Sequence, residues 1–431
     1  MYDYYLVLST VLDSELKQCA DEGRDCQAYE PLVAALQKLP NGAAREKIAQ
    51  AIYDGLMGLP IAAQIEAEPS EWAQILAALP GKPQKANVPL SAEPRMDRVL
   101  GAWQGRCAGC LLGKPFEGAM AADLNAYYGI APGKYGPLAY FQAREAEPVP
   151  FLRDKAHLSI DRLAGMPVDD DTNYTVLALL LLEKYGRNFT RLDWADHFLR
   201  NLPPEATFTA ERVAYRNLLD LVFPPATALL RNPYREWIGA QIRADLYGYV
   251  NPGDPLEAAR MAWTDASVTH VRSGIYGAMW VAASLALAYA LPADRAIRQA
   301  LCVIPPQSRF YRALEEAFRD FDGGMTYEAA LAKLCDRWQE NNTHHWCHTI
   351  SNALIVANAI LYGRNDLEAT LSMAVLPGFD TDCNGATAGS ILGLALGAAA
   401  LPEKWVTPLR DHLDVSLTGM EALSLTELAR R

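Results

Sequence analysis

The chain has 431 residues, 51% of them hydrophobic and 21% charged, which suffices for a large buried core and differs from the composition of a disordered protein. Its 39 basic and 51 acidic residues give a formal net charge of -12, which repels the phosphates of nucleic acids and anionic membrane surfaces. Neither nucleic acid nor a membrane is therefore an expected partner.

Three further features indicate a cytoplasmic protein. Eight scattered cysteines are expected to be buried thiols of a reducing compartment. The N-terminal segment has neither a basic leader nor a small-residue cleavage site, so no signal peptide is predicted. The apolar runs at 274–292 and 384–402 are rich in Gly, Ala and Ser and lack basic flanks, which favours buried core helices over membrane spans. Nothing in the sequence indicates an oligomeric state.

Residues 3–80 predict a small helical appendage. Four short amphipathic helices are expected there, separated at Gly23, at 40–42 and at 59–60. Ser70 is the expected N-cap of the last of these helices.

The next segment, 81–95, contains four prolines or glycines and few large apolar side chains, which is typical of a linker. We therefore expect an appendage over 1–80 and a main domain over 96–431. Helix signals dominate that domain and strand patterns are almost absent, which predicts an all-α fold. Gly186 and Gly363 stand where a helix would end on a left-handed residue. The expected helices span 97–112, 172–185, 192–200, 209–222, 255–266, 274–290, 326–340, 348–362, 366–375 and 384–400.

One stretch, 118–168, is rich in Gly, Pro and Tyr and is too long for an ordinary connection. It is expected to be irregular. A loop that covers the substrate is the functional interpretation, and a surface excursion without a functional role is the alternative.

Two sets of glycines recur at every fourth position, one near each end of the main domain. They are Gly101, Gly105, Gly109 and Gly113, and Gly385, Gly389, Gly393 and Gly397. Because a glycine within a helix costs up to about 1 kcal/mol relative to alanine, these ridges need a structural reason. Close approach of two helix backbones supplies one. We expect these two helices to cross tightly at the centre of the domain.

Five aspartates directly precede two strongly apolar segments that are expected to be buried helices. They are Asp169, Asp170 and Asp171 in one cluster and Asp380 and Asp382 in the other. Helix capping explains one or two carboxylates per helix. Five unpaired buried charges would repel one another and raise their pKa values unless cations neutralise them. Carboxylates are hard oxygen ligands, so the pattern predicts two divalent cations, Mg²⁺ first, with Mn²⁺ or Ca²⁺ as alternatives before Zn²⁺.

Over residues 96–402 the sequence resembles the ADP-ribosylglycohydrolase family, in the order of that family's motifs. The opening GAWQGRCAGCLLGKPFEG resembles the family's first helix and loop, which ends at a glutamate over the active site, here Glu117. DDDT at 169–172 resembles the first metal motif, and FDTDCNGATAGSILG at 379–393 resembles the second. The resemblance implies a compact helical bundle and metal-dependent hydrolysis of a bond to the anomeric carbon of an ADP-ribosyl group. It implies as metal ligands Asp170, Asp171, Asp380 and Asp382.

Four departures from the family's pattern fall at the expected site. Asp169 replaces a hydroxyl ligand, Cys383 replaces the Thr or Ser after the second aspartate, and Cys110 stands where many members have Asp. The small-residue segment whose backbone amides meet a diphosphate is here WIGAQIR at 237–243, followed by Asp245. These changes affect metal selectivity and recognition of a diphosphate. The substrate is accordingly either an ADP-ribosyl group or a related riboside.

The expected catalytic residues are Asp382, which activates water together with the metal pair, and Glu117, which orients the substrate or transfers a proton. Alternatively, Glu117 is an exposed carboxylate on a loop with no catalytic role. Expected substrate-binding residues are Gly239, Arg243, His270 and His348. A structural ion pair for the arginine and core positions for the histidines are the alternatives.

Three other interpretations remain open. A zinc site is an alternative because His344 and His348 share a helix face near His345 and Cys347, although nothing else there completes a tetrahedral set. A glycosidase of the same fold could act on an N- or O-glycoside without a diphosphate. A catalytically silent protein could bind ADP-ribosylated partners, but it would have little reason to keep five aspartates. The expected ligand is a small-molecule glycoside or an ADP-ribosylated substrate.

Overall fold

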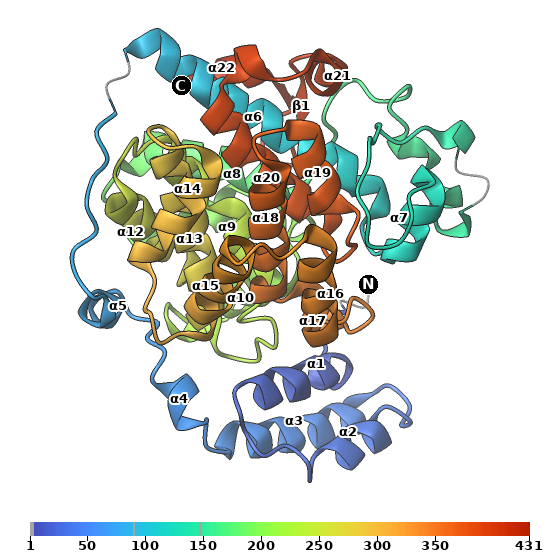
Figure 1. Ribbon diagram of the computed structural model, residues 1–431. Helices are drawn as coiled ribbons and strands as arrows, with labels where there is room; N and C mark the ends of the chain where they lie inside the picture. The colour runs from blue at the N-terminus through green and yellow to red at the C-terminus, as the bar shows by residue number, and fades with distance from the viewer. Residues whose placement is uncertain (1–3, 89–90, 146–148) are drawn as a thin grey trace.

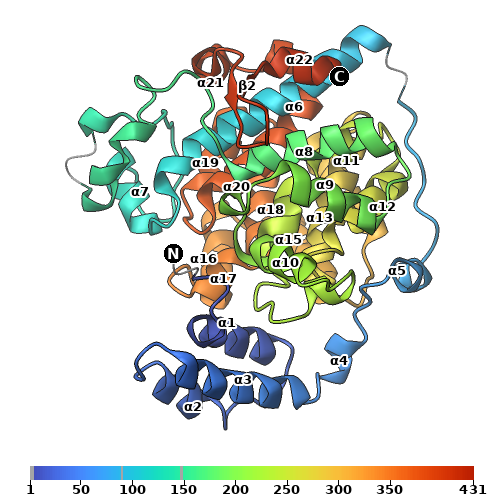
Figure 2. The same ribbon diagram turned by 180° about the vertical axis from the view of Figure 1, so that it is seen from behind.

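The computed structural model describes residues 4–88, 91–145 and 149–431. A large body of packed helices lies above a layer of N-terminal helices, and an extended segment on the outside connects them (Figures 1 and 2). Apart from a two-stranded antiparallel sheet, β1 (Leu413–Asp414) with β2 (Ala422–Leu423), the described residues form helices and their connections. The predicted all-α fold is thus confirmed.

The first three N-terminal helices pack around a hydrophobic cluster of their own, which includes Leu12 and Leu56, whereas Ile75 in the fifth helix belongs to the core of the large body. The division into an appendage over 1–80 and a main domain over 96–431 stays a prediction. The sequence predicts four helices here, and the single turn α4 is additional because so short a segment carries no periodic signal. The helices are α1 (Leu8–Asp21), α2 (Glu30–Leu36), α3 (Ala43–Gly58), α4 (Ala63–Glu66) and α5 (Trp72–Ala78).

The prediction that Ser70 caps a helix is wrong. Helix α5 begins after Glu71, whose side chain makes no capping hydrogen bond. The hydroxyl of Ser70 instead accepts a hydrogen bond from Arg272 N at 3.0 Å, which ties the appendage to the main domain.

The predicted linker, 81–95, ends earlier than expected. Its first part is extended, and Ala86 N donates a hydrogen bond to Gly253 O at 2.8 Å. Residues 89–90 lie outside the described residues. Helix α6 (Ala92–Gly113) then begins inside the predicted linker, because a proline is tolerated in the first turn of a helix, where its missing N–H has no partner to lose.

The two glycine ridges pack against each other, as predicted. They lie on α6 and on α20 (Thr381–Leu396), except that Gly397 directly follows α20, and the two helices cross in the upper part of the body (Figure 1). A Cβ atom on Gly109 would overlap the carbonyl of Gly385, and one on Gly113 would overlap that of Thr381. Glycine therefore permits a backbone separation that no other residue allows. The start of α20, with its aspartates, is fixed against the end of α6.

Two long helices complete the core. Helix α13 (Arg272–Ala288) is buried along its whole length and α18 (Thr349–Gly363) along nearly all of it. In the described residues, no helix is long and apolar enough to cross a membrane. The remaining α-helices are α7 (Ala121–Tyr128), α8 (Asp170–Tyr185), α9 (Arg191–Asn201), α10 (Thr209–Leu219), α11 (Asp245–Tyr249), α12 (Pro255–Ala266), α14 (Ala293–Gln299), α15 (Arg309–Asp322), α16 (Tyr327–Arg337), α17 (Thr343–Cys347), α19 (Leu367–Val375), α21 (Glu403–Val406) and α22 (Leu425–Arg430).

Short 3-10 helices join these elements. They are η1 (Lys114–Phe116), η2 (Ala143–Glu145), η3 (Pro150–Leu158), η4 (Pro204–Ala206), η5 (Ala226–Ala228), η6 (Ile238–Arg243), η7 (Ala300–Val303), η8 (Ala398–Ala400) and η9 (Thr407–Leu409). Every predicted helix of the main domain is present, α12 with the predicted ends and the others with shifted ends. Helix α15 and several helices of eight residues or fewer were not predicted.

Two local predictions are corrected. Gly186 has a positive φ of 72° as expected, but Gly363 is the last helical residue of α18, and Arg364 takes the left-handed conformation with φ 50°. A side chain on Gly363 would overlap the hydroxyl of Thr370, so close packing requires this glycine. The stretch 118–168 is only partly irregular, because it contains α7, η2 and η3; its residues 146–148 lie outside the described residues.

Candidate active site

The two aspartate clusters meet at one cavity of about 450 Å³. Asp169 is the N-cap of α8 and Asp380 that of α20, so the packing of α20 on α6 brings both helix starts together. The described residues that line the cavity are Tyr5, Lys114, Glu117, Val168, Asp169, Asp170, Asn173, Pro203, Glu205, Ala206, Phe208, Thr209, Glu211, Trp237, Ile238, Gly239, Ile242, Trp346, Cys347, Asp380, Asp382, Cys383 and Ser416.

Asp171 lies behind the cavity wall and connects the clusters. A carboxylate oxygen of Asp171, one of Asp382 and the sulfur of Cys383 lie within 4.8 Å of one another. Of the residues predicted for the site, those that line the cavity are Glu117, Asp169, Asp170, Gly239, Asp380 and Asp382. Residues far apart in the sequence thus converge on one small volume.

Both carboxylate oxygens of Asp169 are engaged by the protein. Its Oδ1 accepts a hydrogen bond from Asp171 N at 2.9 Å, which caps α8. Its Oδ2 lies 2.6 Å from Lys114 Nζ. Although burial opposes ionisation, the lysine and these hydrogen bonds lower the pKa of Asp169. This residue is therefore charged and already compensated.

Asp171 is held by an arginine that sequence reasoning missed. Arg106 is fully buried in α6, and its Nη2 donates to Asp171 Oδ1 at 3.0 Å and to Asp171 O at 2.6 Å. Its Nη1 lies 3.0 Å from Asp245 Oδ2. Asp245 is completely buried, paired with this arginine and not among the described lining residues, so the expectation that it affects recognition of a diphosphate is wrong. The sequence offered one signal for this role of Arg106: it is a lone basic residue beside the glycines of a helix that was expected to be buried.

The other carboxylates have raised pKa values. Burial is the largest cause for Asp170, Asp380 and Asp382, and repulsion between the aspartates adds to it. For Glu117, the charge of Asp382 is the largest cause, followed by burial and Asp169, and together they raise its pKa to about 8. Repulsion of this kind disappears when a cation shares the carboxylates.

These residues fit hard divalent cations. Lys114 is the only basic residue among the described residues that line the cavity, and it already faces Asp169. The remaining aspartates supply oxygen ligands without an equal positive charge. Three thiols stand beside them: Cys110 Sγ lies 3.8 Å from Asp171 Oδ2, Cys347 Sγ lies 3.8 Å from Asp380 Oδ2, and Cys383 lines the cavity. Burial raises the pKa of all three thiols, so they are neutral neighbours of an oxygen-ligand site.

Arg243 and His270, both expected to bind substrate, are not among the described residues that line the cavity. Arg243 Nε donates to Asp265 Oδ1 at 2.5 Å, and its Nη1 is paired with Glu211. His270 is buried, with Nδ1 2.6 Å from Thr269 Oγ1, and burial followed by Arg243 holds its pKa well below the usual value. Arg243 and His270 are therefore both bonded to other residues inside the protein.

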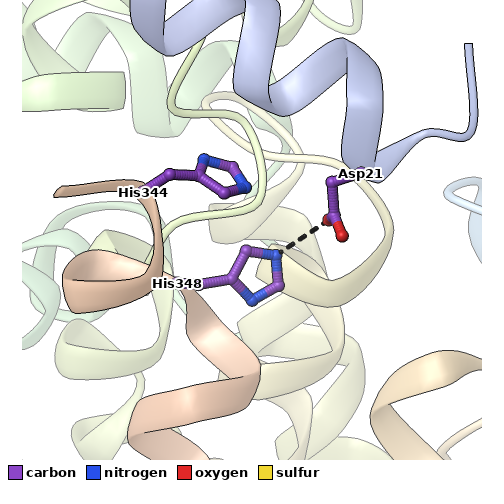
Figure 3. Close-up of side chains that lie close together, drawn as sticks. All are labelled: Asp21, His344 and His348. Atoms are coloured by element: carbon purple, nitrogen blue, oxygen red, sulfur yellow. Dashed lines mark ion pairs between the residues drawn. The ribbon is translucent and has the colours of Figure 1, made fainter. Parts of the chain in front are cut away.

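His348 also lies away from the described cavity wall, next to the appendage. Its Nε2 lies 3.2 Å from Asp21 Oδ2, at the end of α1 (Figure 3). Its Nδ1 accepts a hydrogen bond from Ile350 N at 3.1 Å and so caps α18. Its nitrogens are thus both used in joining the appendage to the start of this helix.

The cluster considered for zinc gains a third residue, because Asp21 joins His344 and His348 with ligand atoms within 4.8 Å of one another (Figure 3). Both histidines, however, use Nδ1 as an acceptor, His344 from Trp237 Nε1 at 3.1 Å and His348 from Ile350 N. A neutral imidazole that accepts at Nδ1 carries its proton on Nε2. Nε2 of His348 then donates toward Asp21, and Nε2 of His344 carries a proton, so neither atom is a zinc ligand in this arrangement.

The segment that replaces the family's diphosphate loop does face the cavity. Trp237 and Ile238 line it, and a Cβ atom on Gly239 would lie 2.6 Å from both carboxylate oxygens of Glu211. Glu205 adds another carboxylate to the wall. The surroundings of this segment are bulky and acidic, which opposes the close approach of phosphate oxygens to backbone amides.

A family model described as ADP-ribosylglycohydrolase matches residues 91–431. No curated protein matches the chain significantly. A solved structure described as an ADP-ribosylglycohydrolase-related protein complex is similar, with 21% sequence identity, a TM-score of 0.46, and coverage of 74% of this chain and 93% of that one. That likeness is too distant to carry an argument, so the assignment rests on the family model. The match extends over most of the chain and includes both aspartate clusters, and the chain therefore belongs to the ADP-ribosylglycohydrolase family.

Proposed function

We propose that this protein is a metal-dependent hydrolase that cleaves a glycosidic bond at the anomeric carbon of an ADP-ribosyl or related ribosyl group. The observation that carries the proposal is the convergence of both aspartate clusters and Glu117 on one cavity. Membership of the ADP-ribosylglycohydrolase family supports glycoside hydrolysis.

Asp170, Asp171, Asp380 and Asp382 are the proposed ligands of two divalent cations, Mg²⁺ first and Mn²⁺ second. Asp169 and Asp171 are weaker candidate ligands than the other aspartates, because their oxygens already have protein partners. Those of Asp169 are bonded to Lys114 and Asp171 N, and those of Asp171 to Arg106 and Cys110. Bound cations would supply Lewis acidity and a site for vicinal ribose hydroxyls. Asp382, at the cavity, is proposed to orient the attacking water as well.

Glu117 is proposed to orient the substrate or to exchange a proton with the leaving group. It follows η1 and lines the cavity on the same side of the molecule as both helix starts. Departure of an aglycone from an anomeric carbon needs an acid at the leaving atom. Glu117 is a lining carboxyl outside the aspartate clusters that lies close enough to Asp382 for its charge to raise the pKa of Glu117.

The cavity favours a riboside without a diphosphate over ADP-ribose. A diphosphate is usually held by cationic side chains or by backbone amides in small-residue segments. Among the described residues of the wall, the one basic side chain, Lys114, is paired with Asp169, and Glu205 adds a carboxylate, whereas Glu211 is already paired with Arg243. The preferred aglycone is accordingly neutral or cationic.

A catalytically silent ADP-ribose-binding protein is the second candidate. The same experiment separates the two functions: ribosides and ADP-ribosylated substrates are incubated with the protein in Mg²⁺ and after treatment with EDTA. Release of free ribose or ADP-ribose that requires Mg²⁺ is the expected result. Binding of ADP-ribose without release from any substrate would establish the silent protein instead.

A further inference from the structure

The cavity wall includes a residue from the extreme N-terminal part of the described chain. Tyr5 precedes α1 and lines the cavity together with Glu117 and Asp170. It lies outside residues 91–431, to which the family model applies. The appendage therefore contributes directly to the site that the main domain builds.

Aromatic packing fixes the position of this tyrosine. The ring of Tyr5 meets Tyr234 edge-on, with centroids 6.0 Å apart, and Phe208 edge-on at 6.3 Å. Tyr234 in turn packs against Trp237, at 4.7 Å. Val11, on α1, belongs to the same hydrophobic cluster as Tyr234 and Trp237. Tyr5 is thus part of a continuous aromatic wall.

A buried ion network holds the appendage in this position. Arg235, in the main domain, pairs with Glu15 at 2.6 Å and with Glu22 at 2.8 Å. Asp21 pairs with Arg309 at 2.8 Å and with His348 at 3.2 Å (Figure 3). Breaking a buried pair on one side leaves an uncompensated charge, so the network specifies one docking position. The position of α1 on the main domain is therefore well defined, and so is the position of Tyr5.

The described lining of the cavity includes two chemically different groups of side chains. The aspartates and Glu117 are acidic, and Tyr5, Phe208 and Trp346 are aromatic. A ligand that satisfies both carries hydroxyl groups at one end and a flat ring at the other. Phe208 is 41% exposed, so an aromatic face at this rim is open to a ligand.

We propose that Tyr5 is a specificity-determining residue, whose ring forms the wall against which the flat, neutral or cationic aglycone of a riboside packs. This deepens the proposed function and rests on it. The residue acts by contact with the aglycone, so it contributes to the affinity for a riboside but not for free ribose or for a metal ion. Stacking of a base on one aromatic side chain changes affinity by about tenfold.

Titration calorimetry tests this with adenosine and ribose as probes, in the presence of Mn²⁺, on the full chain. Tyr5→Ala is expected to weaken adenosine binding about tenfold and to leave ribose binding within about twofold. Tyr5→Phe keeps the ring and should keep the preference for adenosine. Tyr135→Ala is the matched control, because Tyr135 is 46% exposed and is not among the described lining residues.

Equal losses for adenosine and ribose in Tyr5→Ala, an unchanged adenosine affinity, or a wild-type protein without preference for adenosine would each overturn the proposal. A separate titration with Mn²⁺ alone reports on the metal site. Failure of that titration contradicts the proposed function, whereas the ratio of the adenosine and ribose affinities still decides the role of Tyr5.

Discussion

Lys114 Nζ lies 2.6 Å from Asp169 Oδ2, so the aspartate that replaces a hydroxyl in this family is compensated by a lysine of the same cavity. The pair explains how an additional carboxylate is tolerated at the start of α8. Removing either partner leaves the other as an uncompensated, largely buried charge. The two substitutions are therefore expected to be coupled.

Lys114→Met should destabilise the protein, and Asp169→Ser in the same chain should restore much of the loss. Residues that contact each other in this way couple by about 0.5–3 kcal/mol. The measurement is urea unfolding of both single variants and the double variant. Strict additivity of the two changes would contradict the pairing.

Asp382→Asn should abolish hydrolysis while leaving the metal-free protein at least as stable as the wild type. The charge of Asp382 raises the pKa of Glu117 by repulsion, and burial raises the pKa of Asp382 itself. Replacing this carboxylate by an amide therefore removes a repulsive charge from the metal-free protein. Thermal unfolding in EDTA measures this. Asp336→Asn, at an exposed position on α16, is the control and should change neither property. A large loss of metal-free stability in Asp382→Asn would support a purely capping role.

The stability of the metal-free protein should fall as the pH rises from about 4.5 to about 8. Glu117 has its pKa raised from 4.5 to about 8, and those of Asp170 and Asp380 are also raised, so the folded state binds more protons than the unfolded state in this window. Stability then decreases with increasing pH.

Melting temperatures measured in EDTA across this pH range show whether the stability of the metal-free protein falls or rises with pH. Saturating Mg²⁺ should remove the decline, because a cation binds the ionised carboxylates of the folded state. A metal-free melting temperature that rises steadily from pH 5 to pH 8 would contradict the repulsion described here.

Gly109→Ala should destabilise the protein by about 1–3 kcal/mol, the usual cost of overpacking. A Cβ atom there would overlap the carbonyl of Gly385, and neither backbone can move without displacing the start of α20. Gly58→Ala is the matched control, since Gly58 is also helical and has nothing within 4 Å of its Cβ position. Equal stabilities of the two variants in urea would contradict the tight crossing.

ADP-ribose should bind more weakly than a riboside without a diphosphate. Trp237 and Ile238 fill the wall where small residues would admit phosphate oxygens, and Glu211 faces Gly239. Calorimetry with ADP-ribose and adenosine in Mg²⁺ compares them. Micromolar binding of ADP-ribose with negligible binding of adenosine would contradict this account of the cavity.

Local and periodic signals carried most of the successful predictions. Glycines at every fourth position mark a helix face, and Asp169 stands where a helix begins, so the crossing of α6 with α20 could be inferred from sequence. Once that crossing is known, the meeting of the two aspartate clusters follows. These features depend on neighbours along the chain or on one pair of helices.

Contacts between distant segments could not be predicted in the same way. The pairing of Asp21 with His348 and the place of Tyr5 in the cavity depend on how the appendage docks, which leaves no periodic pattern. Arg243 shows a related difficulty. The sequence does not distinguish an arginine that binds substrate from one that forms an ion pair within the protein, as Arg243 does with Asp265. Gly363 was misassigned because packing against Thr370, rather than a left-handed backbone, requires it.

The central claim is that the converging aspartates hold divalent cations on which catalysis depends. Metal analysis of active protein, followed by EDTA treatment and titration with Mg²⁺ or Mn²⁺, tests it most directly. The account predicts two ions per chain, loss of hydrolysis and a lower melting temperature in EDTA, and recovery of both on titration. Full activity in protein that contains less than one divalent ion per chain would contradict it.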